Sequence, residues 1–152
     1  MTITAMAASL VAMNWTNILS GSHLTNTIDT IVEIDRQTRR HAIANSVDCQ
    51  LKFDRRKKHV EVTRWVNGRE FIRTTKYNRT TVVVFFKQEQ SELTYTSQGS
   101  SPSYLLEIST ADKKKTRWLL IAGGTGQHHL FDNENDATKL WDSIQSTGIN
   151  AG

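Results

Sequence analysis

The chain has 152 residues, of which 38% are hydrophobic and 22% are charged, and its formal net charge at pH 7 is +4. This length allows one folded domain with a substantial core, and the composition excludes an intrinsically disordered chain. The single cysteine, Cys49, cannot form an internal disulfide, which favours a reducing compartment.

The net charge is distributed unevenly along the chain. Residues 36–87 contain fourteen basic and four acidic side chains, a net of +10. Residues 1–35 contain three acidic and no basic residues, and residues 88–152 contain eight acidic and five basic residues, so each of these regions has a net charge of −3. A basic excess confined to one region predicts a basic face on a single supersecondary unit.

Residues 1–27 contain no Asp, Glu, Lys or Arg. The apolar run Ile3–Trp15 has thirteen residues, fewer than the roughly twenty that a membrane-spanning helix needs. It lacks the basic start of a secretory signal and the arginines of a mitochondrial presequence. We expect an arm that is either a partly disordered leader or a helix over the protein's own sheet. The alternative is an arm that packs on a neighbouring subunit or a lipid surface.

Two similar segments, Ile34–His41 and Phe53–His59, predict two hairpins with basic turns. Each segment has an Asp-Arg pair after an apolar residue and further basic residues before a histidine. The strands are predicted near 28–34, 40–45, 49–54 and 58–66. For residues 26–44 the alternative is an amphipathic helix. The side chains at helical spacing there are Ile28, Ile31, Val32, Asp35 and Arg39.

A β-meander is predicted around Asn67-Gly68, because an Asn-Gly pair supplies the positive φ angles of a type I′ hairpin turn. The run TTVVVFF at residues 80–86 is β-branched and aromatic, which suits a buried strand. Further strands are predicted near 92–97, 103–110 and 116–122. The glycine-rich stretch 123–127 then breaks the sheet.

A last helix is predicted to start near residues 133–136 and to end before Gly148. Its first turn is acidic, and its apolar side chains recur at i, i+3, i+4 and i+7. These side chains are Ala137, Leu140, Trp141 and Ile144. Because one apolar face on a short helix needs a sheet to cover, we expect Trp141 to be buried there. The predicted fold is mainly β, an antiparallel β-barrel or sandwich over residues 28–148, closed by this helix, with a tail at 149–152.

Several of these features resemble a pleckstrin-homology-like domain. The residues that carry the resemblance are Phe53-Asp54-Arg55, Arg64-Trp65, Gly68 and Leu140-Trp141, within about Asp48–Gln145. The pattern is similar to the small domains of this type in bacterial and plastid membrane-associated proteins, including a photosystem I assembly factor family. The resemblance implies an assembly role, and relatives that bind phosphoinositides do so through a basic loop between strands. This chain lacks the spanning helix of the membrane-anchored relatives.

The basic residues are predicted to form a partner-binding face. Its members are Arg39, Arg40, Arg55, Arg56, Lys57, Lys58, Arg64 and Arg69. We expect a non-catalytic binding or assembly module that docks on an acidic protein or a membrane-associated partner, in the cytoplasm or peripherally at a membrane. The alternative is a nucleic-acid-binding protein, for which Trp65, Phe71 and Tyr77 would supply stacking, although no RNA-binding signature is present.

No cofactor or metal is predicted. His128 and His129 are adjacent, and neighbouring residues on a strand point to opposite faces, so they rarely bind one ion together. A small hydrolase is the least favoured function, because no Gly-x-Ser-x-Gly elbow is present and Cys49 has no identifiable base. The stretch 123–126 lacks the Gly-Lys-Ser/Thr of a phosphate-binding loop.

Overall fold

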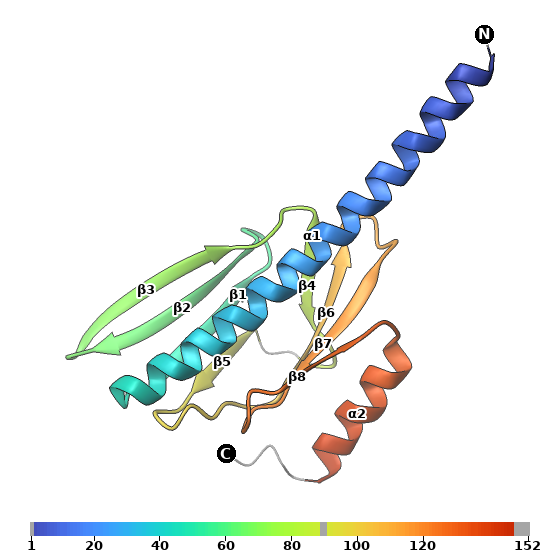
Figure 1. Cartoon of the computed structure of the whole chain (residues 1–152). Coiled ribbons are helices and arrows are strands. Elements are labelled where there is room, and N and C mark those ends of the chain that lie inside the picture. The colour runs from blue at the N-terminus through green and yellow to red at the C-terminus, as the bar shows by residue number, and fades with distance from the viewer. Residues whose placement is uncertain (1, 89–90, 148–152) are drawn as a thin grey trace.

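The fold was analysed in a computed structural model, which describes residues 2–88 and 91–147, with side chains described from residue 21 onward. The chain forms two helices and eight strands within these ranges, shown in Figure 1. They are α1 (Thr2–Asn45), β1 (Cys49–Asp54), β2 (His59–Val66), β3 (Arg69–Lys76), β4 (Thr81–Phe85), β5 (Glu92–Tyr95), β6 (Tyr104–Thr110), β7 (Thr116–Ile121), β8 (His128–Phe131) and α2 (Glu134–Ser146).

The long helix α1 corrects the first predicted hairpin, because residues 28–34 and 40–45 are helical rather than extended. Ile28, Ile31 and Asp35 are buried at helical spacing against the sheets. The β-branched residues of this segment favour strands locally, but burial of one helical stripe outweighs that preference. The helix ends where Ser46 takes a positive φ of 51° and the Val47 N–H donates to the Ala42 carbonyl at 3.1 Å, a Schellman C-cap.

The strands form two four-stranded antiparallel sheets, with orders β3-β2-β1-β5 and β4-β6-β7-β8. The predicted strands at 49–54, 58–66, 92–97, 103–110 and 116–122 are confirmed within a few residues. The type I′ turn is also confirmed, since Asn67 and Gly68 have φ angles of 52° and 74°. The glycine-rich stretch predicted to break the sheet is the turn between β7 and β8.

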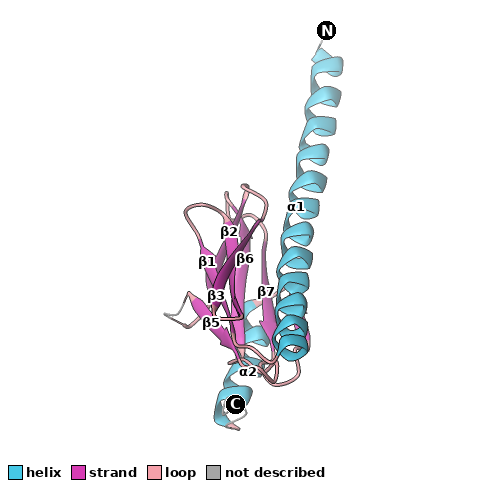
Figure 2. Cartoon of the chain, turned by 90° about the vertical axis from the view of Figure 1, so that its left-hand side faces the viewer, coloured by secondary structure: helices cyan, strands magenta, loops and turns pink. Residues whose placement is uncertain are grey.

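The second sheet is buried on both faces, which explains why β6 is apolar along most of its length. Leu106 and Leu119 belong to the main core, which α1 shares with both sheets. Leu105 and Leu120 point to the opposite face and pack under α2 with Ala137 and Trp141. The layers here are therefore α1, sheet and α2. Figure 2 shows α1 lying along one side of the strands.

The predicted helix at the C-terminal end is confirmed as α2. Its N-cap is Asn133, whose Oδ1 accepts a hydrogen bond from the Asp136 N–H at 2.9 Å. Trp141 is 5% exposed and lies between α2 and the sheet, as predicted.

The predicted fold class was nevertheless wrong. The sheets do not form a pleckstrin-homology-like barrel closed by a C-terminal helix; a long N-terminal helix packs on two antiparallel sheets instead. The error arose because residues 28–34 and 40–45 were predicted as two further strands of a sheet. They belong to α1 instead, which contributes Ile28, Ile31 and Ile34 to the core.

The N-terminal half of α1 projects beyond the sheets (Figures 1 and 2). Leu24 is 3% exposed and already belongs to the core, so the projecting part is residues 2–20 rather than the predicted arm 1–27. These residues continue the same helix without a break. Within the described part of the chain, no helix combines the length and apolar character needed to cross a membrane.

Candidate functional site

Three turns meet at the end of the sheets where α1 leaves them. The β3–β4 turn contacts the helix through Thr80, whose Oγ1 lies 3.2 Å from His23 Nδ1. The β1–β2 turn lies beside the start of β4, because Lys58 Nζ donates a hydrogen bond to the Thr81 carbonyl at 2.9 Å. The β6–β7 turn lies on the other side, where Lys113–Lys115 line a pocket with Gly21 and Leu24. Figure 1 shows these turns on both sides of α1.

These turns carry nine of the nineteen Lys and Arg residues of the chain. We name their nine basic residues the basic rim: Arg55, Arg56, Lys57, Lys58, Lys76, Arg79, Lys113, Lys114 and Lys115. The same turns contain two acidic residues, Asp54 and Asp112, so their net charge is +7, and the rest of the chain sums to −3. The charge of the molecule is therefore concentrated at one end.

The shape of the β1–β2 turn is fixed by hydrogen bonds from its backbone to the Asp54 side chain. Asp54 Oδ1 accepts hydrogen bonds from the N–H groups of Arg56 at 3.0 Å and Lys57 at 2.9 Å. These backbone hydrogen bonds, that of Lys57 first, lower the pKa of Asp54. Because the carboxylate is used within the turn, the side chains of Arg55, Arg56 and Lys57 remain exposed.

Only half of the predicted basic face belongs to this rim. Arg55, Arg56, Lys57 and Lys58 lie there. Arg69 is exposed at the Asn-Gly turn, which lies at the opposite end of β2, and Arg64 is half-buried on β2 opposite Cys49. Arg40 is exposed in the last turns of α1. Lys113–Lys115 lie between the strands predicted at 103–110 and 116–122, and nothing in the sequence indicates that this connection lies beside α1.

Arg39, which was predicted on the binding face, is instead buried at 8% exposure. Its Nε donates to Asp35 Oδ2 at 2.8 Å, one turn earlier in α1. Its Nη1 donates to the carbonyl oxygens of Gly99 at 2.8 Å and Gly123 at 2.5 Å. Its Nη2 donates to Ser101 Oγ at 2.9 Å. One side chain thus ties the helix to two loops.

Two buried tyrosines complete this cluster. The hydroxyl groups of Tyr95 and Tyr104 donate to Asp35 Oδ1 at 2.6 and 3.0 Å. Burial first, and then the neighbouring Asp35 charge, raise the pKa of Tyr95 well above its ordinary value. The loops are also close-packed, because a Cβ on Gly123 would lie 1.8 Å from the Ser101 carbonyl oxygen. We assign the Asp35–Arg39 cluster to fixing α1 on the sheets.

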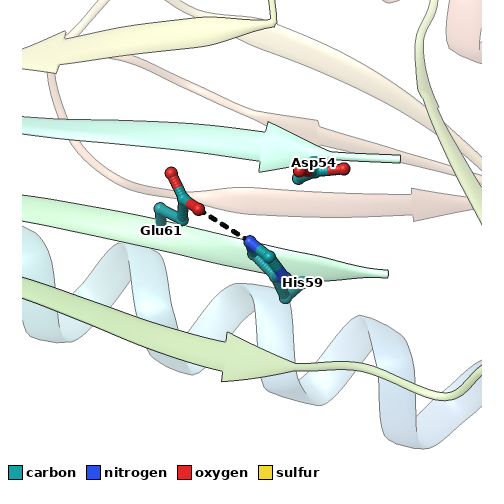
Figure 3. Close-up of side chains that lie close together, drawn as sticks. All are labelled: Asp54, His59 and Glu61. Atoms are coloured by element: carbon teal, nitrogen blue, oxygen red, sulfur yellow. Dashed lines mark hydrogen bonds and ion pairs between the residues drawn. The ribbon is translucent and has the colours of Figure 1, made fainter. Parts of the chain in front are cut away.

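One group of side chains has the composition of a metal site. Asp54, His59 and Glu61 lie close together (Figure 3), and their ligand atoms are within 4.8 Å of one another. His59 Nε2 is already 2.8 Å from Glu61 Oε1, and Asp54 accepts two backbone hydrogen bonds and lies 3.7 Å from Lys57 Nζ. The group also lies within the basic rim, whose charge disfavours a cation, so we assign it to shaping the turn.

The cysteine side chain is also buried. Cys49 is fully buried at the start of β1, and burial raises the pKa of its thiol. A buried thiol with a raised pKa is a poor nucleophile at neutral pH, because the thiolate is the reactive form. Cys49 therefore contributes to the core as a small apolar residue.

Solved structures with this fold include bacterial pilin-like proteins. Two are structures of the minor pseudopilin EpsH from the type 2 secretion system of Vibrio cholerae, with TM-scores of 0.54 and identities of 13% and 11%. The matches cover 68% and 72% of this chain and 92% and 94% of theirs. Another is the type IV minor pilin FimU of Pseudomonas aeruginosa strain PAO1, with a TM-score of 0.56, 16% identity, and coverage of 76% and 90%. No family model and no curated protein matches the sequence.

This likeness corrects two predictions. The pleckstrin-homology-like resemblance was wrong, because the motifs that suggested it, such as Phe53-Asp54-Arg55 and Arg64-Trp65, lie on strands of a different architecture. The predicted cytoplasmic location is corrected by the same comparison, since the fold is that of a secretion-system pseudopilin and a type IV minor pilin. The chain has the pilin-like fold, a long N-terminal helix packed on antiparallel sheets.

Proposed function

We propose that the chain is a non-catalytic structural subunit of a pilus-like or secretion-type assembly, located outside the cytoplasm and attached to a membrane-associated complex. The shared fold with EpsH and FimU supports this proposal. The observation that carries it belongs to this chain: residues 2–20 form half of a long helix, project past the sheets, and contain no charged side chain.

The uncharged half of α1 is expected to gain stability by packing against a partner. Its backbone hydrogen bonds are satisfied internally, but most helical stability in proteins comes from packing of an apolar face rather than from helix propensity. Its apolar residues, including Leu10, Val11 and Ile18, gain stability when they are removed from water. Projecting helices of neighbouring subunits, packed side by side, would bury these residues and leave each body outside the bundle. The proposed partner surface is therefore residues 2–20.

Charges placed in the projecting half should prevent assembly without unfolding the body. For the variant Val11→Asp with Ile18→Asp we expect at least about a 10-fold loss of self-association, because burying an unpaired carboxylate is costly. The thermal unfolding midpoint should change little, since the described core begins at Leu24. Sedimentation velocity of the full chain in mild detergent, with chemical cross-linking, measures the association.

The matched control carries two carboxylates on the packed half of the same helix. Asn26 and Ala44 are both exposed, so Asn26→Asp with Ala44→Asp adds the same charge without entering the proposed interface. The control should associate like the unmodified chain. Equal loss of association in both variants would contradict the proposal, because it would show an effect of net charge alone.

A further inference from the structure

We infer that the basic rim binds the anionic headgroups of a phospholipid bilayer, so that the body lies on the membrane surface while residues 2–20 of neighbouring subunits pack together within the apolar layer. This inference deepens the proposed function and rests on it. It assigns to the rim a ligand chemistry, the phosphate groups of lipids presented as a surface.

The first argument is the direction in which the rim faces. All three turns lie where α1 leaves the sheets, so their side chains meet whatever surface the projecting helix enters. Thr27 and Thr81 fix this arrangement, with their Oγ1 atoms 3.0 Å apart and buried between α1 and β4. This contact holds the β3–β4 turn against α1, close to where the projecting half begins.

The second argument is the density of exposed charge. Seven of the nine basic side chains are exposed, and the turns have a net charge of +7 while the remainder of the molecule has −3. The ion pairs within the rim, Lys57–Asp54 at 3.7 Å and Lys114–Asp112 at 3.6 Å, are long and solvent-exposed, so they compete weakly with a phosphate. A molecule polarised in this way orients with its rim toward a negative surface.

The third argument comes from the helix itself. Residues 2–20 extend over about 28 Å, close to the roughly 30 Å of a bilayer's apolar layer. However, Asn14, Asn17 and several Ser and Thr residues dilute their apolar character. A weakly apolar segment binds a bilayer only marginally alone, and stable attachment needs a second contribution such as a basic patch. The rim supplies that contribution at the helix exit.

The distribution of aromatic residues separates this partner from a nucleic acid. A single-stranded nucleic acid needs aromatic side chains interleaved with the basic ones. Trp65 and Phe71 lie near the Asn-Gly turn, at the opposite end of β2 from the rim, and Tyr77 is buried at 6% exposure. Trp118 lines the pocket beside Lys113–Lys115, but it is half-buried and packs against the core under α2. The rim therefore offers charge without a fully exposed aromatic side chain, which suits lipid headgroups.

The test compares two vesicle compositions with the full-length chain. Flotation and fluorescence titration should show binding to vesicles of phosphatidylcholine with phosphatidylglycerol, and much weaker binding to phosphatidylcholine alone. The rim variant replaces Arg55, Arg56, Lys113 and Lys114 by glutamine. Its affinity for the anionic vesicles should fall at least about 100-fold, since each Lys or Arg near an anionic surface contributes roughly fivefold.

The control variant removes the same charge elsewhere. Arg40, Lys52, Arg69 and Lys139 are exposed and lie outside the rim, so their replacement by glutamine should leave vesicle affinity within about threefold of the unmodified chain. Equal losses in the rim and control variants, or equal binding to both vesicle types, would overturn the inference. Rim-dependent binding to duplex DNA that displaces the protein from vesicles would also overturn it. Self-association in detergent tests the proposed function separately, because that measurement contains no anionic lipid.

Discussion

Replacement of Arg39 by methionine is expected to lower the free energy of unfolding by about 3–5 kcal/mol, because breaking one partner of a buried ion pair leaves the other charge uncompensated. The guanidinium and the Asp35 carboxylate are both nearly enclosed, with side chains 10% and 4% exposed. Although burial acts to lower the pKa of Arg39, the hydrogen bond and charge of Asp35 raise it. Arg39 therefore stays charged, and without it Asp35 is a buried anion beside two tyrosine hydroxyls.

The destabilisation caused by Arg39→Met should exceed the effect of losing the ion pair with Asp35 alone. Arg39 also satisfies the buried carbonyl groups of Gly99 and Gly123, which come from loops far apart in the sequence. An unsatisfied buried acceptor costs about 1–3 kcal/mol. These loops should therefore exchange amide hydrogens faster in the variant, which makes hydrogen exchange a local readout beside urea unfolding.

Two further variants separate the charge from the packing. Arg40→Met changes the next residue, which is exposed, and should alter stability by no more than about 0.5 kcal/mol. The double variant Asp35→Leu with Arg39→Met removes both charges and should recover part of the loss. If Arg39→Met unfolds at the same urea concentration as the unmodified chain, the cluster does not fix α1 on the sheets.

Replacement of Trp141 by alanine is expected to destabilise the protein by about 3–5 kcal/mol, the usual cost of truncating a large buried aromatic residue. Trp141 is the largest side chain of the small core under α2, where it packs with Leu105 and Leu120. These leucines belong to β6 and β7 of the second sheet, so truncation of Trp141 should expose the face of these strands that α2 covers. Urea unfolding followed by circular dichroism measures the change.

The matched control is Gln145→Ala on the exposed side of the same helix, which should be nearly neutral because alanine favours helix and no described contact is lost. Trp141→Phe should fall between the two, because it keeps an aromatic ring at the same place. An unchanged unfolding midpoint for Trp141→Ala would show that α2 does not cover the sheet in solution.

The residues of the basic rim show how far sequence reasoning reaches toward a site. The basic run Arg55–Lys58 was predicted to form a hairpin turn, and Lys113–Lys115 form a second basic run in the sequence. Nothing in the spacing of these runs indicates that they share one end of the molecule. Their meeting depends on the direction of β1, β4 and β6 in two different sheets and on their common contact with α1.

The opposite case is Arg39, for which the local pattern was misleading. It stands beside Arg40 in a basic run, which suggested an exposed turn. In the folded chain the two residues point to different sides of α1, one into a cluster with Asp35 and one to solvent. The i, i+4 spacing of Asp35 and Arg39 was the available signal, and it has this meaning only if the segment is a helix.

The sequence alone determined the features that depend on neighbouring residues: the Asn67-Gly68 turn, the period-two strands around it, the capped amphipathic α2 with buried Trp141, and the uncharged N-terminal segment. These follow from backbone preferences and from the spacing of apolar residues. Only the tertiary structure decided that residues 26–45 are helical, because their β-branched sequence suits either state and the free energy of burying Ile28 and Ile31 between the sheets selects one. The same burial fixed α1 across both sheets, and so placed three basic turns beside the start of its uncharged half.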